Sequence, residues 1–132
     1  MDTLLTIHGE LRWLVAIVAV VVIIKFLIGW LGQRQYKPLD RTLLTIYTIL
    51  LDINVLLGLV LILFYGGLTP PRIEHMTTML LAVIAAHMTA LWRKSDDSAK
   101  KYRNQLLMVA LSLVLVLFAV IRLRGSFVSW PG

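Results

Sequence analysis

The chain has 132 residues, of which 59% are hydrophobic and only 15% are charged. A soluble domain of this length needs a more polar surface, so the surplus of apolar side chains is expected to face lipid. The absence of cysteine excludes disulfides, zinc–thiolate sites, iron–sulfur clusters and cysteine nucleophiles. In so apolar a chain, the net charge of +6 is more typical of basic loops that set membrane topology than of a nucleic-acid-binding surface.

Apolar stretches in the sequence predict four transmembrane helices. The first, 11–31, has Trp13 and Trp30 at interface-like positions, and at 1.5 Å a residue they lie roughly 25 Å apart, close to the hydrocarbon thickness. The other three stretches are 43–65, 73–92 and 106–121. Because the connections are short, neighbouring helices are antiparallel, and we predict one all-α, integral membrane, up-down-up-down four-helix bundle over residues 1–132.

The distribution of basic residues predicts the orientation of the spans. Loops 33–41 and 93–103 are rich in lysine and arginine, whereas the 66–72 turn has only Arg72. Basic loops stay in the cytoplasm, so both termini and the 66–72 turn are expected outside. Residues 1–10 contain no lysine or arginine, which favours a retained first span over a cleaved signal peptide.

Polar side chains at membrane depth are costly and therefore candidate functional groups. Toward the cytoplasmic side lie Lys25, Asp52 and His87, with Asn54 slightly deeper. Lys25 is able to pair with Asp52, or it can extend to the interface and leave Asp52 hydrogen-bonded or protonated inside the bundle. A proton path through Asp52 and His87 is a third alternative.

A second group of polar residues gathers at the outer side. His8 and Arg12 share one face of the first helix if that helix begins by residue 6, and Glu74 and His75 open the third span. Two histidines on facing helices are what axial ligation of a b-type haem requires, and Arg12 and Arg72 are placed to pair its propionates. His87 lies about 120° around the helix from His75, so the two cannot share one ligand.

Other interpretations of the outer group stay open. His8, Glu74 and His75 also suit a metal site, and Met76 and Met79 beside His75 leave a copper alternative. Each histidine alone is more often an interfacial hydrogen-bonding residue than a ligand. Gly58 in the second span predicts a close helix contact.

With these residues in view, the chain resembles a group of small four-helix bacterial membrane proteins, some of them labelled cytochrome-b-like. The matching pieces are His8-x-x-x-Arg12-Trp13, Leu51-Asp52-Ile53-Asn54-Val55-Leu56-Leu57-Gly58, Glu74-His75-x-x-x-Met79-Leu80, His87, Trp92-Arg93-Lys94 and Trp130-Pro131. The resemblance covers nearly the whole chain and implies a multi-pass protein of the bacterial cell (inner) membrane. The family often carries glutamine or histidine near residues 52–54, and this departure puts in doubt any scheme that needs a second-helix histidine.

Two functional hypotheses follow from these features. One is a haem-b-binding or redox-associated accessory subunit of a respiratory or photosynthetic complex; the alternative is a cofactor-free structural subunit whose buried charges fix helix register and partner contacts. A small transporter is less favoured, because the first span has no glutamate in the membrane core. The expected partners are lipid and other membrane subunits or further copies of the chain, not nucleic acid. Without a nucleophile–base pair or a phosphate-binding loop in the sequence, an enzyme acting on soluble substrates is not expected.

Overall fold

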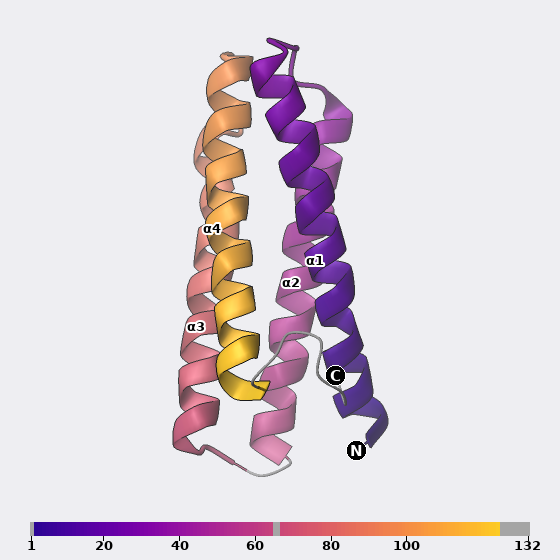
Figure 1. Ribbon diagram of the computed structural model, residues 1–132, viewed down its shortest axis with the longest axis vertical. Coiled ribbons are helices and arrows are strands. Elements are labelled where there is room, and N and C mark those ends of the chain that lie inside the picture. Colours follow the sequence, from indigo (N-terminus) through magenta and orange to yellow (C-terminus); the bar gives the residue numbers. More distant parts are fainter. Residues whose placement is uncertain (1, 65–66, 125–132) are drawn as a thin grey trace.

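The computed structural model describes residues 2–64 and 67–124, and these form helices without any strand. The elements are α1 (Asp2–Leu31), α2 (Pro38–Phe64), α3 (Pro70–His87), the 3₁₀ helix η1 (Met88–Trp92) and α4 (Ser98–Arg124). The predicted all-α four-helix bundle is confirmed (Figure 1).

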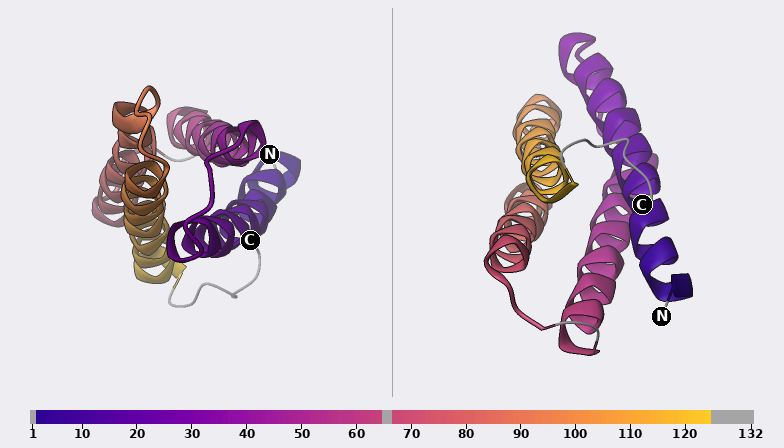
Figure 2. Two further views of the ribbon diagram at one scale, coloured as in Figure 1. Left: turned by 90° about the horizontal axis from the view of Figure 1, so that it is seen from above. Right: turned by 60° about the horizontal axis from the view of Figure 1, so that its bottom comes forward.

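Successive helices run in opposite directions (Figure 1), and the view from above shows them arranged in a ring (Figure 2). α1 contacts α2 and α4, and α3 contacts the same two helices, so α1 and α3 lie diagonally opposite each other (Figure 2). The contact between α2 and α3 is the least extensive of the four. The bundle is therefore closed more tightly on three sides than on the fourth, the α2–α3 side.

The two ends of the bundle differ in chemistry. At one end, which we call the basic end, residues 32–37 and 93–97 connect the helices. At the opposite end, which we call the histidine end, α1 begins and α3 follows α2. The up-down order thus places His8 and His75 near the same end, as the sequence predicts.

All four helices are long and apolar enough to cross a membrane, over residues 3–31, 38–64, 70–92 and 98–122. Their outward surfaces carry large apolar side chains, since Ile17, Leu56, Ile84 and Val114 are each 57–60% exposed. Contiguous apolar surface of this kind suits lipid and not water. The chain is a small multi-pass membrane protein.

The helices extend beyond the predicted spans, mainly into polar sequence. α1 begins at Asp2 rather than at residue 11, and α4 begins at Ser98 rather than at residue 106. α2 begins at Pro38, a residue well suited to a first helical turn, and the Asp40 carboxylate accepts a hydrogen bond from the Lys37 amide at 2.8 Å. Several predicted features, namely the span end at 65, the Gly66 part of the turn and the Trp130-Pro131 match, lie outside the described residues.

An aromatic cluster joins α1 to α4 near the basic end. Phe26 meets Tyr102 edge to face with ring centroids 5.4 Å apart, and Tyr36 lies 5.0 Å from Tyr102. Gly29 allows this contact, because a Cβ at that position would lie 2.5 Å from Cζ of Tyr102. The close contact between α1 and α4 thus depends on the absence of a side chain at Gly29.

Candidate functional site

A small cavity at the histidine end is lined by side chains from all four helices. The lining groups are those of His8, Gly9, Arg12, Asn54, His75, Met79, Val116 and Val120. The cavity volume is about 20 Å³, enough for one water molecule. His8 and Arg12 of α1 and His75 of α3, which the sequence singled out, therefore come together at one place.

His8 lies within the bundle and not above it. α1 is helical from Asp2, so His8 and Arg12 do share a helix face. The His8 ring rests on α2, where a Cβ added to Gly58 would lie 3.0 Å from the ring atom Cε1. The close contact predicted for Gly58 is thus present, and its partner is an imidazole.

His75 is held by the backbone of α4. Its Nδ1 lies 3.0 Å from the carbonyl oxygen of Ala119. Because a carbonyl oxygen can only accept, Nδ1 carries the proton, and Nε2 keeps its lone pair when the ring is neutral. In the neutral ring this hydrogen bond selects the tautomer whose proton is on Nδ1.

Arg12 and Asn54 add buried polar groups to the same cavity. Arg12 is only 3% exposed; its Nη1 donates to the Gly9 carbonyl at 3.0 Å, and its guanidinium lies 5.2 Å from the Trp13 ring centre. Asn54 is 6% exposed, and its Oδ1 accepts no hydrogen bond from any described residue. An unsatisfied acceptor beside a cavity of this size suits a bound water or another donor.

Other residues of the predicted outer group lie elsewhere. Arg72 is not among the cavity-lining residues, and its Nη1 donates to the Gly67 carbonyl at 3.1 Å. Glu74 forms an ion pair with Arg122 at 2.8 Å. Within residues 2–64 and 67–124, no set of three or more histidine, aspartate or glutamate side chains is arranged to hold a metal ion, so His8, Glu74 and His75 do not assemble as a metal site.

Lys25 pairs with Asp40 and not with Asp52, which corrects one of the alternatives drawn from the sequence. Asp40 is fully buried, and it also accepts a 2.6 Å hydrogen bond from the Tyr102 hydroxyl. In the sequence, Asp40 lies within the loop predicted at 33–41 and outside the predicted spans. The available signal was its position in the first turn of a helix that begins with proline, where a carboxylate is stabilised by the helix dipole.

Asp52 and His87 bond to each other across the α2–α3 contact. His87 Nε2 lies 2.8 and 3.0 Å from the two carboxylate oxygens of Asp52. The side chains are 42% and 54% exposed, so the pair is open to the membrane side of the bundle rather than enclosed in its core. Asp52 and His87, the two residues of the proton path proposed from the sequence, are thus hydrogen-bonded to each other.

Uncharged polar residues tie the helices together, and the sequence analysis missed them. Ser112 donates to the Ala82 carbonyl at 2.9 Å, so the Tyr47 hydroxyl, 2.7 Å away, is the donor to Ser112. Tyr36 donates to Gln105 at 2.6 Å, and burial raises the pKa of this phenol, which keeps its proton. Apart from Asn54, the polar residues that the sequence singles out at membrane depth are ionisable, whereas these partners are neutral.

Comparison with protein-family models, with curated proteins and with solved structures finds no match for this chain. The resemblance to cytochrome-b-like membrane proteins therefore stays a prediction.

Proposed function

We propose that this membrane protein is a haem-b-binding, redox-associated subunit of a respiratory or photosynthetic complex, with His8 and His75 as axial ligands. The observation that carries the proposal is the convergence of His8 and His75 on one cavity from the diagonally opposed helices α1 and α3. A haem iron takes one imidazole on each face of the macrocycle, and facing helices of a bundle supply such a pair.

The hydrogen bonding of His75 supports the ligand role. Metal-bound histidines commonly donate their second ring N–H to a backbone carbonyl, which orients the ring and sets the tautomer. Nδ1 of His75 has such a carbonyl partner in Ala119, so Nε2 is the nitrogen that would ligate the iron. Arg12 beside it is the cation best placed to pair with a propionate, because Arg72 does not reach the cavity.

The two histidines are suitable haem ligands, but the cavity between them is too small for a haem. A cavity of about 20 Å³ holds one water, so haem entry requires α1 and α3 to separate at the histidine end and Met79, Val116 and Val120 to move. Methionine is an unbranched and adaptable filler, which favours such a rearrangement. The Lys25–Asp40 contact lies at the basic end and the Tyr47–Ser112 contact in the middle of the bundle, so neither joins α1 to α3 at the histidine end.

An absorption spectrum of the purified full-length protein from haem-replete cells tests the proposal. We expect a Soret band with α and β bands on reduction, lost in His75→Ala and in His8→Ala but kept in His87→Ala, the matched control. A folded, colourless wild-type protein would contradict haem binding. Equal loss in all three variants would contradict the ligand assignment.

A cofactor-free structural subunit is the second candidate, and the size of the cavity favours it. In this case a single water satisfies Asn54, and the polar contacts between helices set the helix register. The same purified protein then stays colourless when haem is added, while His75→Ala lowers its thermal stability because α3 loses its hydrogen bond to α4.

A further inference from the structure

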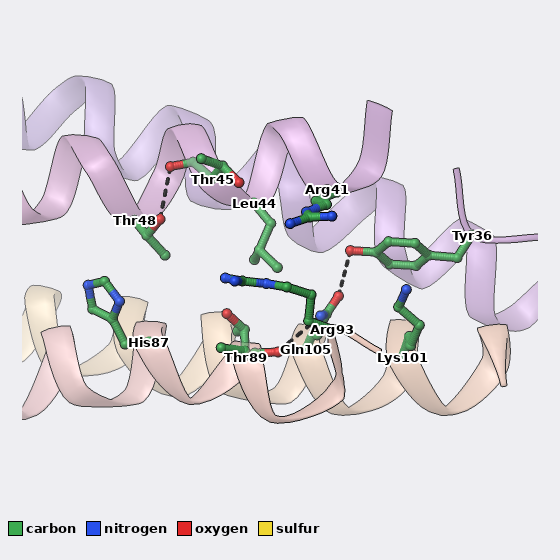
Figure 3. A pocket seen from close by; sticks show the side chains of 11 residues that line it. Tyr36, Arg41, Leu44, Thr45, Thr48, His87, Thr89, Arg93, Lys101 and Gln105 are labelled. Atoms are coloured by element: carbon green, nitrogen blue, oxygen red, sulfur yellow. Dashed lines mark hydrogen bonds between the residues drawn. The ribbon is translucent and has the colours of Figure 1, made fainter. Parts of the chain in front are cut away.

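A second recess lies at the basic end, in the open α2–α3 side of the bundle. This groove has a volume of about 120 Å³ and is lined by residues of α2, η1, α4 and the connecting segments and by His87 at the end of α3. Figure 3 shows Arg41 on one wall and Arg93 and Lys101 on the other, with their cationic groups turned toward the space between. It is separate from the histidine cavity, which lies at the opposite end of the bundle.

Three cations line the groove, and none of the described aspartates or glutamates does. The Asp52 carboxylate lies outside the lining and is hydrogen-bonded to the lining residue His87. Arg41 and Arg93 join none of the ion pairs found among the described residues, and Lys101 lies 4.1 Å from the Tyr36 ring centre without a carboxylate partner. Two guanidinium forks and an ammonium converging on a recess are the groups that bind phosphate.

Neutral polar groups shape the same recess and hold its wall in place. Gln105 accepts from the Tyr36 hydroxyl at 2.6 Å and donates to the Thr89 carbonyl at 3.1 Å, which links α4 to η1 (Figure 3). Thr45 and Thr48 lie on the facing α2 wall, where the Thr48 hydroxyl donates to the Thr45 carbonyl. Because these hydrogen bonds already hold the wall in place, ligand binding does not carry the entropic cost of ordering it.

The position of the groove favours a lipid phosphate over a free one. It opens between two membrane-spanning helices at the level where the basic loops begin, and apolar side chains next to its lining residues, Ile49, Met88 and Leu91, are 40–69% exposed. A phosphate held there has apolar surface below it for acyl chains. Basic pockets between transmembrane helices bind the head groups of anionic phospholipids in this way.

We propose that the groove formed by Arg41, Arg93 and Lys101 binds the phosphate of an anionic phospholipid from the leaflet at the basic end. Arg41 and Arg93 clamp the phosphate oxygens, and Lys101 adds a third charge from α4. This site does not depend on a cofactor at the histidine end, so the two proposals stand or fall separately.

Lipid binding is measured by native mass spectrometry of the full-length protein released from detergent, titrated with phosphatidylglycerol or with phosphatidylcholine. We expect phosphatidylglycerol to be retained about tenfold more tightly, and the double variant Arg41→Gln/Arg93→Gln to lose about tenfold or more of that affinity. The matched control Arg34→Gln/Arg103→Gln removes two charges near the same end that do not line the groove, and it should change the affinity less than threefold.

Three outcomes would overturn the proposal. Equal retention of phosphatidylglycerol and phosphatidylcholine would show that the groove does not prefer an anionic lipid. Equal losses of affinity in the two double variants would show that binding depends only on the net charge of the protein. Displacement of phosphatidylglycerol by millimolar inorganic phosphate would assign the groove to a free anion. If circular dichroism shows that the double variant does not fold, the single change Arg93→Gln is compared with Arg103→Gln under the same criteria.

Discussion

Asp40 is fully buried at the basic end and has three polar partners. Its fully buried carboxylate pairs with Lys25 of α1 and accepts hydrogen bonds from the Tyr102 hydroxyl of α4 and from the Lys37 amide. One side chain on α2 therefore joins three helices. Membrane depth, estimated from position in the sequence, could not identify Asp40 as the partner of Lys25. The choice between Asp40 and Asp52 depends on how each helix is rotated about its axis.

We expect Asp40→Asn to destabilise the protein by about 2–4 kcal/mol, because Lys25 and Tyr102 lose an anionic partner inside the bundle. Unfolding in detergent, followed by far-ultraviolet circular dichroism during titration with a denaturing detergent, measures this loss. Glu74→Gln is the control, since it removes the carboxylate of an exposed ion pair and should change the midpoint far less. Equal effects of the two substitutions would show that the Asp40 contacts do not stabilise the fold.

Gly29 is a second position where one atom matters. An added Cβ would meet the Tyr102 ring at 2.5 Å, and that ring is held by Phe26 and by its hydrogen bond to Asp40. Gly29→Ala should therefore cost about 1–3 kcal/mol through overpacking, in spite of the better helix propensity of alanine. The same unfolding titration checks it, with the lipid-facing Ile28→Ala as the comparison; a variant at least as stable as the wild type would contradict the packing.

At the scale of the helices, apolar length was enough to locate all four spans. The helix ends could not be predicted from apolar length, because residues 2–10 and 98–104 are largely polar. Their helicity depends on neighbours in the fold. The groove at the basic end was not predicted for a related reason. Arg41, Arg93 and Lys101 come from three segments, and only the folded bundle brings them to one recess.

The Tyr47–Ser112–Ala82 chain of hydrogen bonds connects α2, α4 and α3 in the middle of the bundle. Tyr47→Phe and Ser112→Ala should each destabilise by about 0.5–2 kcal/mol, the range measured for interhelical hydrogen bonds in membranes. The double variant should cost less than the sum of the two, because both changes remove the same bond. Strict additivity in the unfolding titration would mean that the two hydroxyls act independently.

For the whole molecule, the orientation in the membrane follows from the charge of the connecting loops. We expect the basic end to face the cytoplasm and both termini to lie outside. A C-terminal alkaline phosphatase fusion should be active and the matching green fluorescent protein fusion dark. The reverse pattern would invert the orientation and place the histidine end in the cytoplasm.

The convergence of residues at the histidine end is the claim on which the functional proposal depends, and the absence of native cysteine allows a direct measurement. His8→Cys/Gly58→Cys places one thiol on α1 and one on α2 where the imidazole now touches the glycine. In intact membranes, a short bifunctional thiol reagent should link this pair and protect it from later labelling with a maleimide polymer. The control pair His8→Cys/Ile53→Cys, whose α2 position faces away from the core at 45% exposure, should stay unlinked. Linking of the control pair, or full labelling of both pairs, would contradict the placement of His8 inside the bundle.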